Sequence, residues 1–158
     1  MKPSTVGGPY ASSGNVGIGL ILGSPTGISG KLYLGPGAAI DAALGLGIGE
    51  DVHLHVDYLF EFDDLAKQPG FRLGWFAGIG GRLADTDEDD YTHVHGNGVR
   101  HRHDRDELDL GPRVPVGLEF RANELPRLEI FAEVALGLDL VEDPGLTIDA
   151  GIGGRFFF

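Results

Sequence analysis

Apolar and polar residues alternate along most of this chain with a period of two, which is the repeat of a β-strand. The clearest stretch is 52–62, where apolar side chains occupy every second position and His53, His55, Asp57 and Glu61 lie between them. Similar stretches follow one another, separated by short turns rich in Gly, Pro and Asp. No helical period of 3.6 residues competes with this alternation. The pattern therefore predicts an all-β chain.

Eight alternating segments are expected, joined in order as an antiparallel meander. They cover residues 16–22, 28–34, 40–48, 52–62, 71–83, 110–120, 128–138 and 148–158. A long polar insertion, 84–107, separates the fifth segment from the sixth. Pro112 and Pro115 lie within the sixth segment and cannot donate backbone hydrogen bonds. We expect a β-bulge there, or a strand that starts late, near Val114.

The two faces of these segments differ sharply in composition. One face carries mainly Leu, Ile, Val and Phe, whereas the other combines glycine with charges of both signs. The interior of an eight-stranded barrel is just wide enough to be filled by side chains, so the large apolar face cannot be accommodated inside. The sequence thus predicts an eight-stranded antiparallel up-and-down transmembrane β-barrel with a filled polar lumen. The predicted lumen residues are Lys31, Asp41, His53, His55, Asp57, Glu61, Arg72, Arg82, Arg113, Glu119, Glu129, Glu133, Asp139, Asp149 and Arg155.

Composition narrows the function classes. The formal net charge of −12 argues against nucleic acid as a partner, because such binding needs a clustered basic surface. No stretch of about 18 apolar residues is present, which excludes a transmembrane helix. The 27 glycines follow no collagen-like period, so we expect them to make room for long lumen side chains.

The last segment alternates up to a C-terminal phenylalanine, with Phe156 and Phe158 on its apolar face. This ending resembles the closing strand of bacterial outer-membrane barrels. The whole span from Val16 to Phe158 resembles the small OmpA-type and OmpX-type barrels of Gram-negative bacteria. Members of this architecture act as anchors, adhesion or host-interaction proteins, small channels and, occasionally, lipid-modifying enzymes.

The resemblance implies a location and partners. It implies a monomer in the bacterial outer membrane, with an export signal removed and the lipid bilayer and the barrel-assembly machinery as partners. Phe156 and Phe158 would then be the insertion signal. We expect a flexible segment at 1–14, a single barrel domain at 15–158 and an extracellular loop at about 84–108. An aromatic girdle is expected at the periplasmic rim, formed by Phe60, Phe62, Phe71, Phe120, Phe156 and Phe158.

Two histidine groups are candidates for chemistry. The insertion holds two H-x-H pairs, whose nitrogens are suitable ligands for Zn²⁺, Cu²⁺ or Ni²⁺, although a hydrated surface loop explains the same residues. These pairs are His93 with His95 and His101 with His103. On the fourth segment, His53, His55 and Asp57 share the inward face, where they suit either acid/base chemistry or a network that fills the lumen.

Three functions remain open at this point. The first is an outer-membrane barrel with a structural or surface-interaction role, no large pore, no enzymatic activity and no cofactor. The second is a membrane-embedded enzyme or metal-binding surface protein that uses the histidine-rich loop. The third is a soluble ligand-binding β-barrel.

Overall fold

The computed structural model describes residues 14–46, 52–86, 107–140 and 145–158, and these contain eight β-strands. The strands are β1 (Val16–Gly23), β2 (Gly27–Gly35), β3 (Ala38–Leu46), β4 (Val52–Lys67), β5 (Phe71–Thr86), β6 (Glu107–Ala122), β7 (Leu128–Asp139) and β8 (Gly145–Phe157). The all-β prediction is confirmed. Residues 1–13 of the expected N-terminal segment and 87–106 of the expected loop lie outside the described residues.

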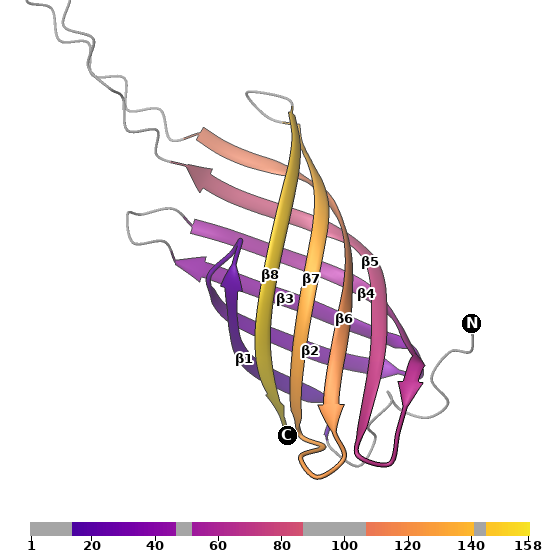
Figure 1. The fold of residues 1–158 in the computed structure, drawn as a ribbon. Coiled ribbons are helices and arrows are strands. Elements are labelled where there is room, and N and C mark those ends of the chain that lie inside the picture. The colour runs from indigo at the N-terminus through magenta and orange to yellow at the C-terminus, as the bar shows by residue number, and fades with distance from the viewer. Residues whose placement is uncertain (1–13, 47–51, 87–106, 141–144) are drawn as a thin grey trace, which may run out of the picture.

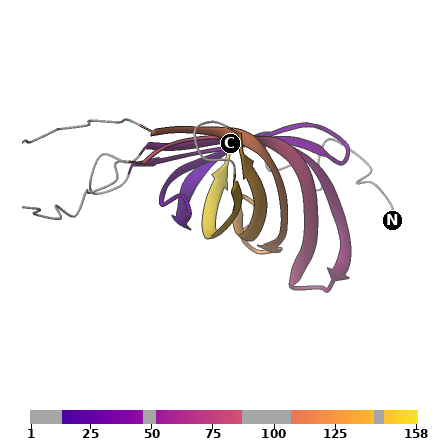
Figure 2. The ribbon, with the colours of Figure 1, turned by 90° about the horizontal axis from the view of Figure 1, so that it is seen from above.

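Each strand pairs antiparallel with the next one in sequence, and β1 also pairs with β8, which closes the barrel (Figure 1). The closing register runs from Gly17 opposite Phe157 to Gly23 opposite Gly151. Seen from above, the strands are strongly curved (Figure 2). The predicted eight-stranded up-and-down topology is therefore confirmed.

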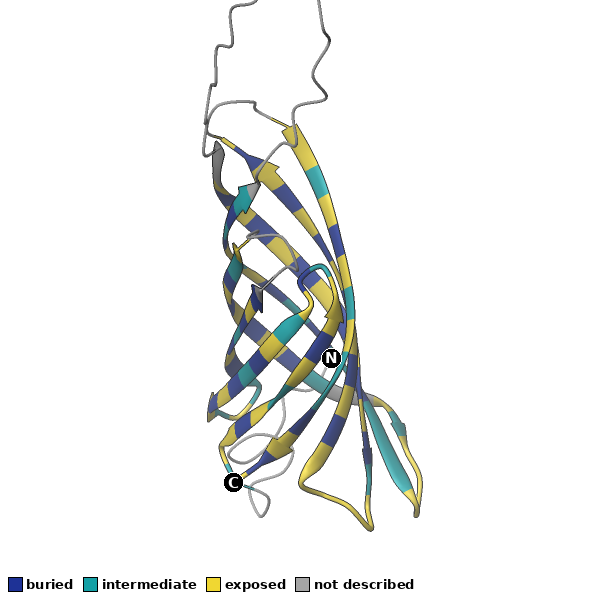
Figure 3. Ribbon diagram, turned by 90° about the vertical axis from the view of Figure 1, so that its left-hand side faces the viewer, coloured by how far each residue is buried: buried dark blue, intermediate teal, exposed yellow. Residues whose placement is uncertain are grey.

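Burial alternates along the strands as the sequence pattern predicts (Figure 3). In β7, every second residue from Glu129 to Asp139 is buried, and the residues between them are exposed. The exposed positions carry large apolar side chains such as Val134, which is 52% exposed. The apolar face thus points outward and the charged face inward.

The hairpin of β4 and β5 extends beyond the predicted segments. The fourth alternating segment ends at Phe62, but β4 continues to Lys67 through an irregularity in its register between Phe62 and Ala66. A bulge of this kind lets a strand continue while its side chains change direction. At this end of the barrel, a hydrogen bond joins the turn after β4 to the turn after β6: the Asn123 side chain donates to the carbonyl of Pro69.

The prediction for the proline-containing strand is wrong. β6 begins at Glu107 rather than near Val114, and its register with β5 is the same on both sides of the prolines. The ladder lacks only the pairs that would join Gly78 to Pro115 and Ile79 to Val114. Proline has no N–H to donate to the neighbouring strand. The strand therefore accommodates Pro115 by a local gap in pairing, without a bulge.

Several glycines allow aromatic rings to enter the lumen. A Cβ atom at Gly117 would collide with the ring of Phe76, and one at Gly17 would collide with the ring of Phe157. The glycine-rich inward face therefore makes space for rings as well as for the charged side chains that the sequence predicts there.

Candidate functional site

The candidate site is the lumen itself, which is filled by buried polar side chains from the seven strands β2 to β8. They form two groups. The Glu129 network consists of Ser29, Lys31, Tyr33, Asp41, Glu61, Glu119, Arg121, Glu129 and Arg155. The Arg113 network consists of Ser24, His55, Asp57, Arg82, Arg113, Glu133, Asp139, Thr147 and Asp149.

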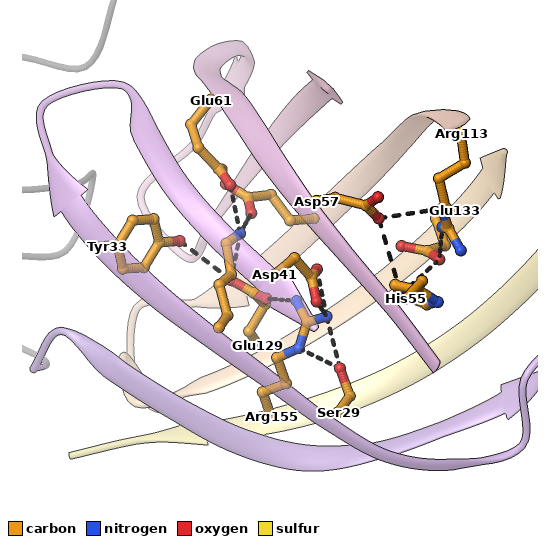
Figure 4. A network of polar contacts seen from close by, with 12 residues as sticks. Ser29, Tyr33, Asp41, His55, Asp57, Glu61, Arg113, Glu129, Glu133 and Arg155 are labelled. Carbon is orange, nitrogen blue, oxygen red and sulfur yellow. Dashed lines mark hydrogen bonds and ion pairs between the residues drawn. The ribbon is translucent and has the colours of Figure 1, made fainter. Parts of the chain in front are cut away.

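Glu129 on β7 is fully buried and joins side chains from three other strands (Figure 4). Its Oε2 atom accepts hydrogen bonds from Arg121 Nη2 at 2.7 Å and from the Tyr33 hydroxyl at 3.3 Å. Its Oε1 atom accepts from Arg155 Nη1 at 3.2 Å. Glu129 therefore links its own strand to β2, β6 and β8 across the lumen. The bonds from the two arginines are charge-assisted, which makes them stronger than bonds between neutral groups.

Arg155 extends this network toward β2 and β3. Its Nη2 atom lies 2.6 Å from Asp41 Oδ2, and its Nε and Nη2 atoms both donate to Ser29 Oγ, at 2.9 and 2.7 Å. The guanidinium carbon also lies 3.7 Å from the centroid of the Phe131 ring. Arg155 is thus held by a carboxylate, a hydroxyl and an aromatic face at once.

Aromatic rings seal the same level of the barrel. The Arg121 guanidinium carbon lies 4.0 Å from the centroid of Phe157, and the rings of Phe157 and Tyr33 are 5.4 Å apart. Both rings belong to a buried apolar cluster that includes Leu59 and Phe76. Charged groups and rings are therefore packed together in the lumen near the end of β8.

The Arg113 network occupies the other half of the lumen. Arg113 Nη2 lies 2.7 Å from Glu133 Oε1, and Arg113 Nε lies 3.1 Å from Asp57 Oδ2. His55 Nε2 is 3.9 Å from both of these carboxylate oxygens. Arg82 lies 3.3 Å from Asp139 and donates to the Thr147 hydroxyl. The guanidinium of Arg113 thus already fills the position between the carboxylates.

The structure brings most predicted lumen residues together. His53 and Arg72 are only half-buried, and Arg72 lies at the start of β5, opposite Arg121 in the ladder with β6. The sequence interpretation missed Arg121, Ser29 and Tyr33. Arg121 directly follows the sixth alternating segment, so extending the period of two by one residue would have identified it. The predicted lumen residues found buried are Lys31, Asp41, His55, Asp57, Glu61, Arg82, Arg113, Glu119, Glu129, Glu133, Asp139, Asp149 and Arg155.

The metal-binding hypothesis for the histidine-rich loop stays a prediction. His93, His95, His101 and His103 lie outside the described residues. Within 14–46, 52–86, 107–140 and 145–158, no group of three or more His, Asp or Glu side chains has a geometry that could hold a metal ion. In the same part of the chain, no helix is long and apolar enough to span a membrane.

Comparison with known proteins identifies the fold. The structure is similar to the crystal structure of the N-terminal β-barrel domain of Pseudomonas aeruginosa OprF, with a TM-score of 0.50 and 13% sequence identity. The match covers 90% of this chain and 94% of that domain. No family model and no curated protein sequence matches the chain. The chain therefore has the fold of the small, OmpA-type eight-stranded barrels, as its sequence predicts.

Proposed function

We propose that this protein is a transmembrane barrel of the bacterial outer membrane, with a structural or surface-interaction role and no large pore. The supporting observation is the apolar outer wall. Leu20, Ile79 and Ile152, on three different strands, are 64%, 62% and 55% exposed. Soluble monomers rarely expose continuous apolar surface on this scale. A soluble ligand-binding barrel would instead place its apolar side chains inside.

The filled lumen supports a role other than solute passage. The Glu129 network connects β2, β3, β4, β6, β7 and β8 across the interior, and the ring of Phe157 packs against it. An eight-stranded barrel leaves little space beyond its side chains. The function is therefore assigned to the barrel as an anchor and to the surface that it presents, and not to transport of large solutes.

The ends of β8 and β1 support the barrel-assembly machinery as a partner. Phe156 and Phe158 point outward beside the closing seam, and the backbone N–H of Phe158 donates to the carbonyl of Val16 at 2.8 Å. The two outward rings are 5.2 Å apart. This arrangement presents an apolar signal on the strand that closes the barrel.

The test is refolding with and without detergent. We expect a β-rich species only in detergent, and we expect it to migrate differently on a gel before and after boiling. Circular dichroism and gel migration are measured on the same samples. A β-rich monomer in plain buffer would overturn the membrane assignment. Rapid swelling of liposomes in sugar solutions would contradict the absence of a large pore.

A further inference from the structure

The buried charges of the lumen do not balance. Among the described residues, the buried set includes eight carboxylates and five lysine or arginine side chains, besides the imidazole of His55. The carboxylates are Asp41, Asp57, Glu61, Glu119, Glu129, Glu133, Asp139 and Asp149, and the basic side chains are Lys31, Arg82, Arg113, Arg121 and Arg155. An unpaired buried charge is costly, so such a group takes a counter-ion or a proton. The geometry shows where one proton fits.

Within the Glu129 network, one ammonium group faces two carboxylates. Lys31 Nζ lies 2.7 Å from Glu61 Oε1 and 2.7 Å from Glu119 Oε2, whereas Glu129 Oε2 lies farther away, at 3.6 Å. All three side chains are at most 1% exposed. The guanidinium groups of Arg121 and Arg155 bond instead to Glu129 and Asp41. One positive charge thus serves two carboxylates at this point.

The remaining oxygens of the two carboxylates have no donor. Glu61 Oε2 and Glu119 Oε1 are buried and lack a hydrogen-bond partner. The two carboxyl groups are nevertheless held close together, because each has an oxygen 2.7 Å from the same Lys31 Nζ. Two ionised carboxylates repel each other and offer only acceptors. A hydrogen bond between the two groups forms only when one of them is protonated and can donate. The missing partner in this position is therefore a proton.

A metal ion fits this position less well than a proton. The cation position between the two carboxylates is already occupied by Lys31 Nζ, which also lies 4.9 Å from the Tyr33 ring centroid and 5.5 Å from that of Phe76. The only oxygen that these two rings could offer to a metal ion is the Tyr33 hydroxyl. That hydroxyl already donates to Glu129 and accepts from Arg121.

We propose that Glu61 and Glu119 share a single proton in the folded barrel, so that the group they form with Lys31 is neutral. The proton bridges the two carboxyl groups, while Lys31 donates to Glu119 Oε2 and forms an ion pair with Glu61 Oε1. The proposal does not depend on the biological role of the barrel. It requires only that the chain folds with this lumen.

Infrared spectroscopy of the refolded protein tests the proposal. We expect the carbonyl stretch of a protonated carboxylic acid, shifted when the protein is made with ¹³C-labelled glutamate and shifted again in D₂O. Glu61→Gln and Glu119→Gln should each remove this band and leave the thermal unfolding midpoint nearly unchanged, because a neutral amide replaces a neutral acid or its partner. The double variant should unfold at a lower temperature, because Lys31 then loses both carboxylates at 2.7 Å and keeps only Glu129, at 3.6 Å.

Glu129→Gln is the matched control. This carboxylate accepts bonds from Arg121 and Arg155, so its loss should lower the unfolding midpoint while the acid band remains. Absence of a ¹³C-glutamate-sensitive acid band in the wild-type protein would overturn the proposal, as would a band that survives both single substitutions. Gel migration of each sample reports folding separately, so failure of the barrel to form is distinguished from absence of the proton.

Discussion

At the scale of single residues, Arg155 contacts a carboxylate, a hydroxyl and an aromatic ring at the same time. Its replacement by Met would leave Asp41 buried without its cation and Ser29 without its donor. Removing one partner of a buried ion pair costs about 3–5 kcal/mol. We therefore expect Arg155→Met to lower the free energy of unfolding by this amount in urea titrations followed by gel migration.

Arg127→Met serves as the comparison, because Arg127 is exposed in the turn before β7. It should unfold at nearly the wild-type urea concentration. Equal midpoints for Arg155→Met and Arg127→Met would mean that the buried network contributes little to stability.

The sequence predicts which residues enter the lumen much better than it predicts their partners. A period of two is enough to place Lys31, Glu129 and Arg155 on the inward face, and all three are buried there. That Arg155 meets Asp41 rather than another carboxylate depends on the tilt and stagger of strands across the barrel, which alternation does not encode. Tyr33 is missed by the sequence interpretation because an aromatic ring is unexpected on a face composed of glycine and charged residues.

At the scale of the elements, β5 and β6 are the long strands that flank residues 87–106. Their ladder continues to the pair of Thr86 and Glu107. We expect that replacing 87–106 with a short Gly/Asn turn leaves the barrel folded, because surface connections tolerate such changes. The measurement is gel migration of the refolded variant before and after boiling. Loss of the folded form would mean that the segment is needed for the barrel.

The same variant tests the metal hypothesis for the loop. It lacks His93, His95, His101 and His103, so any Zn²⁺, Cu²⁺ or Ni²⁺ bound through these histidines should be lost in a calorimetric titration. Metal binding that persists in the shortened chain would exclude these histidines as the ligands.

β6 shows why element boundaries were harder to predict than element number. Pro112 and Pro115 favour a late strand start, but the pairing of β6 with β5 continues on both sides of them and extends the strand to Glu107, whereas pairing with β7 begins at Arg113. Tertiary pairing thus outweighs the local preference of proline, at the cost of an interrupted ladder beside Gly78.

At the scale of the whole molecule, the apolar outer wall determines in which environment, lipid or water, the barrel is stable. Val134 is 52% exposed on β7, and Leu54 lies on the outward face of β4 opposite Leu83. A charge near the middle of the bilayer on this face costs about 2–4 kcal/mol. We expect Leu54→Arg and Val134→Arg each to reduce folding into lipid vesicles, measured as the fraction of heat-modifiable protein on a gel.

Val134→Leu is the control for this experiment, because it keeps the position apolar. It should fold into vesicles as the wild type does. Normal folding of both arginine variants would contradict the assignment of the lipid-facing surface.

β8 has a further consequence for the order of assembly. It carries Arg155 and Phe157 into the lumen and pairs with β1 along the closing seam. Until β8 docks, Asp41 and Ser29 lack the guanidinium that binds them, and Arg121 lacks the ring of Phe157. An intermediate built from β1 to β7 would therefore be both open at its edge and hydrated inside. Docking of β8 therefore closes the wall and completes the lumen network through the same strand.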